Sequence, residues 1–411
     1  MFYAADLGGF MDFLFWIIGF GLPVVGFFAG SYGVVQILII IFFSAPVSIK
    51  LRRQGLLKSS KPFVSNFASL LVLSALFFAF TLLVLTPAFG RTIDQIPLLN
   101  DRHPPRLDST KLHIKYLGAG GLFLRRGKDV VLTAPFFSNP SLKSLLFWRI
   151  KSKPKEIDRF LAPMRSELAE THAILVGHAH YDHLMDLPHI LATYTPNARV
   201  YGSRTAYHTL STTVDKSRLV MLNEQMGNIS MPGQWIEIAD GRIRFMALES
   251  EHAPHFNGLK MFRGSYHKDL QRLPRRAAGW REGQTLSYLI DFLERPGGPI
   301  VYRLYYQDAA SSPPSGFPPS LNRRVDLAML CVAGYNEVGN YPQDLVNHLQ
   351  PKRVAMIHWE NFFSRLPEDP QDLRPVPFLN MENFVERMEP ALPPGADYVL
   401  PAPGSWIKVV P

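Results

Sequence analysis

Two long blocks without charged side chains open the chain, and a mixed pattern follows them. Residues 13–49 and 63–90 contain no Asp, Glu, Lys or Arg. A helix needs about 20 apolar residues to cross a bilayer, so the second block predicts one membrane span and the first is long enough for two short ones. The pattern therefore predicts a transmembrane module of two or three helices over residues 1–90. A secretory signal peptide is disfavoured, because no positive charge precedes the first block and a second block follows it.

The loop between the two blocks indicates how the chain is oriented. It carries five cations and no acid, namely Lys50, Arg52, Arg53, Lys58 and Lys61. The positive-inside rule places such a loop in the cytoplasm. We therefore expect an integral membrane protein, of the inner or plasma membrane if it is bacterial. The residues after the last span are expected on the non-cytoplasmic side.

The pattern changes after the second block. Residues 91–112 contain three prolines and are predicted to form a linker. From residue 113 to residue 411, short β-branched and aromatic runs alternate with amphipathic stretches, which is typical of an α/β domain. Examples are the predicted strands 199–202 and 286–291 and the predicted helix 341–349, which has a proline near its start.

Four side chains that can bind metals follow the apolar run 173–177 within six residues: His178, His180, Asp182 and His183. Residues two apart on an extended backbone point the same way, so the first two histidines can face one point. The other two can serve a second point close to it. Neutral imidazole and carboxylate are ligands of zinc, manganese and iron in catalytic sites. Since the chain has only 13 His in 411 residues, the cluster favours a metal site over a His-rich surface loop.

This order, His-x-His-x-Asp-His, resembles the signature of the metallo-β-lactamase superfamily, whose members bind two metal ions between two β-sheets. Three further matches follow in the family's order, each after a strand-like run: His252, Asp308 and His358. The resemblance covers residues 110–365, approximately. It implies a four-layer αββα sandwich with the metals at one edge of the paired sheets.

The resemblance also implies a role for each of the seven side chains. The first ion would be held by His178, His180 and His252, and the second by Asp182, His183 and His358, with Asp308 bridging the two. The cofactors would be two divalent metal ions. Zn²⁺ is favoured, and Mn²⁺ and Fe²⁺ are the alternatives. A metal-bridging hydroxide would attack phosphorus or a carbonyl carbon, with Asp182 and Asp308 as catalytic residues.

Within the superfamily, the chain is most similar to the branch of N-acyl-phosphatidylethanolamine phospholipase D and the ascorbate-phosphate lactonases. The likeness rests on residues 114–118, 131–138 and 330–335 and on His358-Trp359. Ala119 stands where the branch has His, Ala134 stands where it has Asp, and Gln307 replaces the usual Gly before Asp308. The first two lost groups would orient metal ligands. A catalytically degenerate membrane scaffold or sensor is therefore an alternative, although all seven predicted ligands are present.

The formal net charge of +9 is concentrated in one segment. Residues 255–282 hold seven cations and two acids, directly after His252. The segment is interpreted as a clamp for an anionic substrate or lipid head groups, with His255, Lys260 and Arg263 as substrate contacts. The alternative is a solvated loop. No nucleic-acid partner is expected, because nothing in the chain resembles a nucleic-acid module.

Residues 142–153 interleave aromatic and aliphatic side chains with cations. This composition fits a helix at a lipid surface, and it fits equally an ordinary helix with a basic outer face. Cys331 is the only cysteine and is predicted to be buried.

The sequence as a whole predicts a membrane-anchored metal-dependent hydrolase, phosphodiesterase- or phospholipase D-like, whose partners are the lipid bilayer and an anionic small-molecule or lipid-derived substrate. Hydrolysis of a lactone or amide is the alternative.

Overall fold

The computed structural model describes residues 96–106, 108–255 and 258–409. The predicted membrane module over residues 1–90 lies outside these described residues. Among the helices that are described, none is long and apolar enough to cross a bilayer. All described residues belong to one compact unit that spans Pro87–Pro411.

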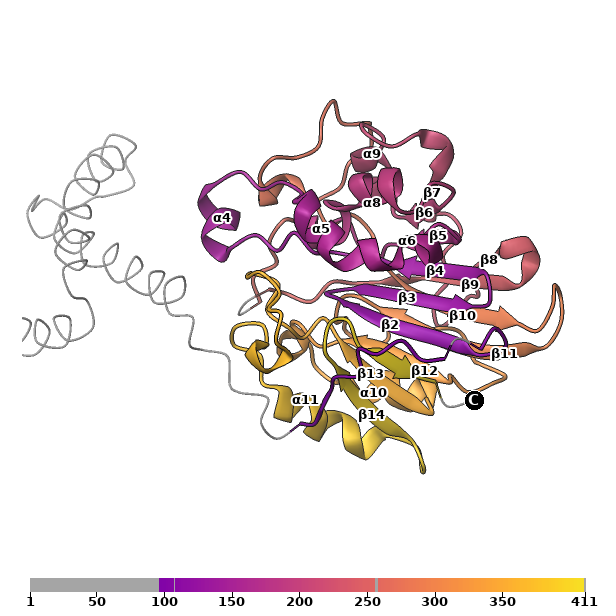
Figure 1. Cartoon of the computed structure of the whole chain (residues 1–411). Helices are drawn as coiled ribbons and strands as arrows, with labels where there is room; N and C mark the ends of the chain where they lie inside the picture. The colour runs from indigo at the N-terminus through magenta and orange to yellow at the C-terminus, as the bar shows by residue number, and fades with distance from the viewer. Residues whose placement is uncertain (1–95, 107, 256–257, 410–411) are drawn as a thin grey trace, which may run out of the picture. The chain divides into compact units, whose positions relative to one another are not determined.

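Two β-sheets lie face to face in this unit (Figure 1). The first has seven strands in the order β15-β2-β3-β4-β5-β6-β7. Its strands are β2 (Leu112–Gly118), β3 (Gly121–Arg126), β4 (Asp129–Thr133), β5 (Thr171–Leu175), β6 (Arg199–Gly202), β7 (Leu219–Met221) and β15 (Trp406–Lys408).

The second sheet has eight strands in the order β1-β14-β13-β12-β11-β10-β9-β8. They are β1 (Leu98–Leu99), β8 (Trp235–Ile238), β9 (Ile243–Ser250), β10 (Thr285–Leu293), β11 (Ile300–Gln307), β12 (Leu327–Cys331), β13 (Arg353–Ile357) and β14 (Asp397–Pro401). β1 falls in the predicted linker and pairs in parallel with β14. Two residues within the predicted linker thus complete an edge of this sheet.

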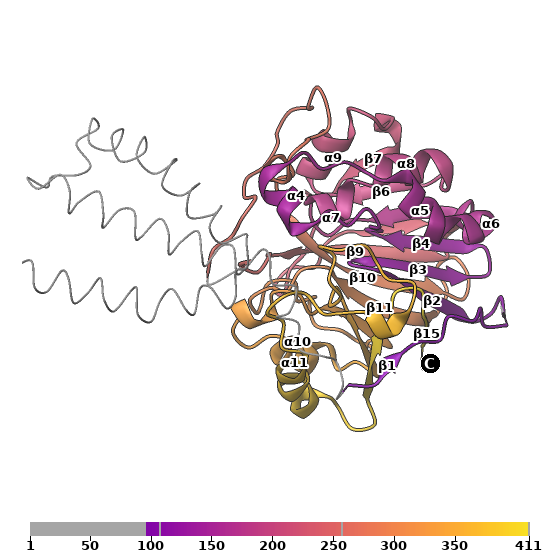
Figure 2. The ribbon, with the colours of Figure 1, turned by 60° about the vertical axis from the view of Figure 1, so that its left-hand side comes forward.

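Helices cover the outer face of each sheet (Figure 2). The seven-stranded sheet is covered by α5 (Pro154–Leu161), α6 (Arg165–Leu168), α8 (Leu187–Thr193) and α9 (Arg204–Leu210), and α4 (Leu142–Phe147) lies beside them. The eight-stranded sheet is covered by α10 (Gln343–Leu349) and α11 (Met381–Met388). The predicted α/β sandwich of two sheets between helical layers is confirmed.

The sequence pattern explains the central strands. All nine residues of β10 and all five of β12 are buried. A strand covered on both faces reads as a nearly continuous apolar run rather than as an alternating one. The predicted strand 199–202 coincides with β6, and 286–291 lies within β10. The predicted helix 341–349 is observed as α10, which begins two residues later because Pro342 is its N-terminal cap.

One charged cluster is buried in the eight-stranded sheet. Asp291 on β10 stands opposite Arg303 on β11 and Arg244 on β9. Its Oδ1 accepts a hydrogen bond from Arg303 Nε at 2.7 Å, and Arg244 Nη2 lies 3.0 Å from Oδ2. Asp291 and Arg303 are both buried, so each charge depends on the other for compensation.

Replacing Asp291 by alanine is expected to lower the free energy of unfolding by about 3–5 kcal/mol, because it leaves a buried guanidinium without its partner. Urea denaturation of the full chain in detergent measures the loss. The matched control is Asp397→Ala, which removes the partner of Arg353 at an exposed site and should cost about 1 kcal/mol or less. Equal losses of unfolding free energy in the two variants would show that burial does not make the Asp291 cluster more important for stability than an exposed ion pair.

Candidate metal centre

The predicted ligands come from both sheets and meet at one edge. β5 ends at Leu175 and leads through the loop that carries His178 and His180 into α7 (Tyr181–Leu184), which carries Asp182 and His183. From the other sheet, His252 lies two residues beyond β9, and Asp308 and His358 directly follow β11 and β13. The centre therefore lies where strand ends from the two halves of the sandwich come together.

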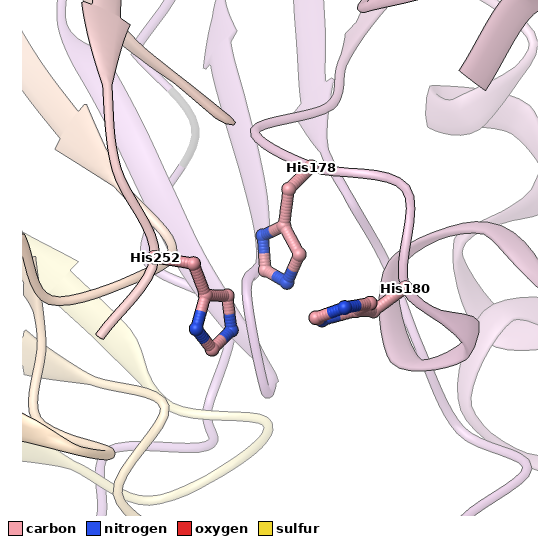
Figure 3. Close-up of side chains that lie close together, drawn as sticks. All are labelled: His178, His180 and His252. Carbon is pink, nitrogen blue, oxygen red and sulfur yellow. The ribbon is translucent and has the colours of Figure 1, made fainter. Parts of the chain in front are cut away.

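Three of these histidines form the first group (Figure 3). One ligand atom from each of His178, His180 and His252 lies within 4.8 Å of the other two. His178 Nδ1 lies 3.0 Å from Asp308 Oδ1. An ionised carboxylate only accepts hydrogen bonds, so Nδ1 carries the proton and Nε2 keeps its lone pair. His252 is oriented in the same way, because its Nδ1 lies 2.6 Å from the backbone oxygen of Ala253.

The electrostatics of this group keep the rings neutral. Burial lowers the pKa of His178 and of His252 well below the ordinary value of 6.5, and neighbouring histidines add to the effect. Burial likewise lowers the pKa of His180 to about 3. Neutral imidazole is the form that binds metals. The first group thus offers three lone pairs without first losing protons near neutral pH.

The second group gathers around one carboxylate. Asp182 Oδ2 lies 3.4 Å from His183 Nε2 and 3.4 Å from His358 Nε2. Ligand atoms of His178, Asp182 and His183 also lie within 4.8 Å of one another, so His178 adjoins both groups. Burial alone would raise the pKa of Asp182, but the two neighbouring imidazoles bring it well below its usual range. This carboxylate is therefore ionised.

Asp308 contacts the Nδ1 atom of one histidine in each group, His178 and His183. It accepts hydrogen bonds from Gly177 N at 3.0 Å and from His178 Nδ1 at 3.0 Å, and its Oδ2 lies 3.3 Å from His183 Nδ1. A Cβ at position 177 would stand 2.0 Å from Asp308 Oδ1, so only glycine permits this approach. Burial lowers the pKa of His183, but Asp308 and Asp182 outweigh it and raise that pKa. The geometry gives Asp308 an orienting contact, and its bridging role stays a prediction.

These residues fit a divalent metal ion. Within the described residues, His178 Nε2, His180 Nε2 and His183 Nε2 are buried and have no hydrogen-bond partner. Buried polar atoms are normally hydrogen-bonded, so unpaired nitrogens within the two adjoining ligand groups are best explained by bound metal ions. Imidazole nitrogens together with ionised carboxylates are a donor set that suits zinc and iron.

Sequence reasoning missed one buried carboxylate beside the centre. Glu360 accepts a hydrogen bond from the backbone N–H of Ala119. Its Oε2 accepts from the Tyr116 hydroxyl at 2.5 Å, and that hydroxyl accepts from His358 N at 2.8 Å. His358 adopts a left-handed backbone conformation with φ of 56°, which costs about 1–3 kcal/mol and persists only where the surroundings enforce it. Glu360 is thus a positioning residue for the last ligand.

Replacing Glu360 by alanine leaves the buried N–H of Ala119 without an acceptor, which costs about 1–3 kcal/mol. The Tyr116 hydroxyl keeps only its longer contact, to the backbone oxygen of Ala119 at 3.2 Å. We expect a corresponding loss in the free energy of unfolding, together with weaker binding of the second metal ion. Glu360→Gln keeps one carbonyl acceptor and should recover part of both properties. Urea denaturation and metal titration of the two variants test this, and an alanine variant with unchanged stability and metal affinity contradicts it.

The lowered pKa of His180 has a consequence for stability. Unfolded histidine titrates near pH 6.5, whereas the folded, metal-free protein holds His180 neutral down to about pH 3. Between these values the unfolded chain binds more protons, so the free energy of unfolding falls as pH decreases, by about 1.4 kcal/mol per pH unit for this group. In chelator-treated protein, His180→Gln should therefore lose stability more slowly than wild type between pH 6 and pH 5. If the free energy of unfolding falls equally steeply with pH in the variant and in wild type, the lowered pKa of His180 is contradicted.

The three predicted substrate contacts have different surroundings. The ring of His255 stacks on that of His252, with centroids 4.7 Å apart and planes at 14°. Lys260 Nζ lies 2.8 Å from Glu282 Oε1, so its charge is already compensated, and Arg263 is exposed on the same loop. A pocket of about 480 Å³ adjoins this region, and its lining includes Glu249, Glu251 and Glu282. The surroundings of His252 therefore include carboxylates as well as cations.

Comparison with known proteins agrees with the fold. A family model described as "Beta-lactamase superfamily domain" matches residues 135–302. No curated protein matches significantly. Residues 135–302 are therefore similar to a β-lactamase superfamily domain, and both His/Asp groups able to hold a metal ion lie within this match.

The solved structures that match this chain are distant. Igni18, a metallo hydrolase from the archaeon Ignicoccus hospitalis, is 15% identical with a TM-score of 0.41, and the match covers 72% of this chain and 97% of that one. YhfI from Bacillus subtilis, a metallo-beta-lactamase fold protein, is 10% identical with a TM-score of 0.43, covering 72% and 100%. CmlA from Streptomyces venezuelae, a diiron beta-hydroxylase, is 14% identical with a TM-score of 0.40, covering 74% and 54%. At this distance they carry no argument about substrate or metal, and the likeness to the phospholipase D branch stays a prediction.

Proposed function

We propose that this protein is a membrane-anchored, dinuclear metal-dependent hydrolase that acts on a phosphodiester or lipid-derived substrate. The observation that supports it most is the convergence of two ligand groups, which share His178, at the edge of the two sheets. Membrane anchoring rests on the uncharged blocks 13–49 and 63–90. The basic loop between the two blocks supports a non-cytoplasmic position of the hydrolase domain.

Metal ions bound in this centre would activate water as a nucleophile near neutral pH and would stabilise negative charge on substrate oxygens. The chain's own residues prepare the centre for this chemistry. Asp308 fixes the ring of His178, Glu360 acts through Tyr116 on the backbone of His358, and burial keeps the first three histidines neutral. None of these roles requires a serine or cysteine nucleophile.

An anionic substrate is supported by exposed cations on the loop that follows His252. Arg263, Lys268, Arg272, Arg275 and Arg276 are exposed. Guanidinium groups suit bidentate binding of phosphate oxygens. A phosphodiester or a lipid head group is therefore the favoured substrate class.

Hydrolysis of a lactone or amide is the second candidate, and the carboxylates beside His252 favour it. The pocket next to Glu251 also contains Glu249 and Glu282. A substrate that bears net negative charge would be repelled there, whereas a neutral ester or amide would not.

Activity assays of the full chain in detergent distinguish these candidates. Wild type and Asp308→Ala would be compared on bis(p-nitrophenyl) phosphate, N-acyl-phosphatidylethanolamine, a simple lactone and an anilide. Metal-dependent diester cleavage that is lost in the variant supports the proposal, and cleavage of the lactone or anilide alone favours the second candidate. No turnover on any of these substrates by metal-loaded protein would favour the scaffold or sensor alternative.

A further inference from the structure

Three consecutive large hydrophobic residues are exposed on the segment around α4. Leu146, Phe147 and Trp148 have 43%, 55% and 50% of their surface exposed. Among the described residues, no other exposed large hydrophobic residues are consecutive. In α4, Leu145 is buried and Leu142 packs against the core, whereas Leu146 and Phe147 are exposed. A contiguous exposed patch of this kind usually marks an interaction surface.

The charges around this patch have a single sign. Lys143, Arg149 and Lys151 are exposed, and residues 142–155 contain no acid. Lys143 Nζ lies 5.1 Å from the centroid of the Trp148 ring. A tryptophan flanked by cations is typical of the boundary between lipid head groups and acyl chains. A second copy of this chain would bring the same cations together across the contact and is therefore disfavoured.

The position of the patch relates it to the metal centre. β4 and β5 are parallel, so both end at the same sheet edge. α4 follows β4, and the metal ligands follow β5. Figures 1 and 2 both show α4 projecting from the side of the domain at which these strands end. Ile150 N donates to Arg275 O at 2.8 Å, which ties the segment to the basic loop after His252, where Arg275 and Arg276 are exposed.

We infer that the α4 surface, defined as residues 142–151, inserts its exposed apolar side chains Leu146, Phe147 and Trp148 into an anionic lipid bilayer while its cations contact the head groups. This placement turns the edge of the sandwich that carries the metal centre toward the lipid. A lipid-derived molecule could then reach the centre without crossing water. Only this statement about the substrate class rests on the proposed function. Lipid contact at α4 is independent of how the chain is anchored.

Spin labels test the inference on the full chain in nanodiscs. Phe147→Cys and Trp148→Cys would be made as two variants and labelled separately. Native Cys331 is buried, so the label should react with the introduced cysteine. Lys128→Cys is the matched control, since it lies in the turn between β3 and β4 at the opposite ends of the strands. In phosphatidylglycerol discs, labels at 147 and 148 should be more accessible to oxygen than to a water-soluble nickel chelate, and the label at 128 should show the reverse.

The contribution of the cations to lipid contact is tested separately. Replacing Lys143, Arg149 and Lys151 by glutamine, or using phosphatidylcholine discs, should make the label at 147 several-fold more accessible to nickel. Labels at 147 and 148 that match the control at 128 in anionic lipid overturn the inference, and so does spin–spin broadening that reveals a second copy at this surface. Equal immersion in neutral and anionic lipid overturns the role of the cations. Alkaline extraction of the same protein reports separately whether the chain is an integral membrane protein.

Discussion

Replacing His178 by alanine is expected to abolish metal-dependent hydrolysis and to reduce bound metal more than any other single ligand substitution. The reason is that His178 belongs to both ligand groups, whereas His180, His252, Asp182 and His183 each belong to one. Its loss also leaves Asp308 without the imidazole that its Oδ1 contacts at 3.0 Å. Loss of an outer partner alone typically costs about 10–100-fold in metal affinity or activity, so loss of this shared ligand should cost at least about 100-fold. Elemental analysis and an activity assay on the same preparation measure both effects.

The control for this prediction is a histidine of α8. His189 contacts Asp158 at 2.9 Å and takes no part in either ligand group. His189→Ala should retain both metal ions and activity at a similar cost in stability. A His178→Ala protein that keeps wild-type metal content and turnover would refute the assignment of the centre.

Asp308→Asn is expected to lower metal affinity about 10–100-fold while the protein stays folded. The carboxylate accepts hydrogen bonds from Gly177 N and His178 Nδ1. An amide can accept one of these, but its NH₂ group then faces the other donor. The conflict is relieved when His178 moves its proton from Nδ1 to Nε2, which removes the lone pair that faces the other histidines. Competition titration with a chromophoric chelator measures the change in affinity.

Asp186→Asn is the matched control for Asp308→Asn. Asp186 is also fully buried and accepts from backbone donors, namely Phe137 N at 2.8 Å and Ser138 N at 2.9 Å. It should change stability and leave metal affinity unaltered. Equal metal affinity in wild type and Asp308→Asn would show that neither an orienting nor a bridging role of Asp308 matters.

Much of the sandwich and of the ligand set could be predicted from the sequence because both depend on local patterns. Each proposed ligand follows an apolar run, and β5, β9, β11 and β13 are those runs. His252 lies two residues beyond its strand rather than directly after it, a difference within the usual uncertainty of strand ends. The strand β1 within residues 91–112 could not be predicted, because a two-residue edge strand has no periodicity to detect.

The features that sequence could not predict are contacts between distant segments. Glu360 meets Ala119 across 241 positions of the chain, and no local pattern distinguishes a carboxylate that is buried there from one on the surface. The contact between Asp308 and His178 requires Gly177, which reads in the sequence as an ordinary loop glycine. Residues 142–153 allowed a lipid-facing or a core-facing helix, and the exposure of Leu146, Phe147 and Trp148 favours the first.

The central claim is that this sandwich holds two catalytic metal ions at the His178–His358 centre. Elemental analysis of the full chain, purified in detergent without added metal and again after reconstitution, tests it most directly. We predict two divalent ions per chain in the reconstituted protein, and fewer in His178→Ala. Fewer than one ion per chain after reconstitution of the wild type, with an unchanged result in the variant, would contradict the account.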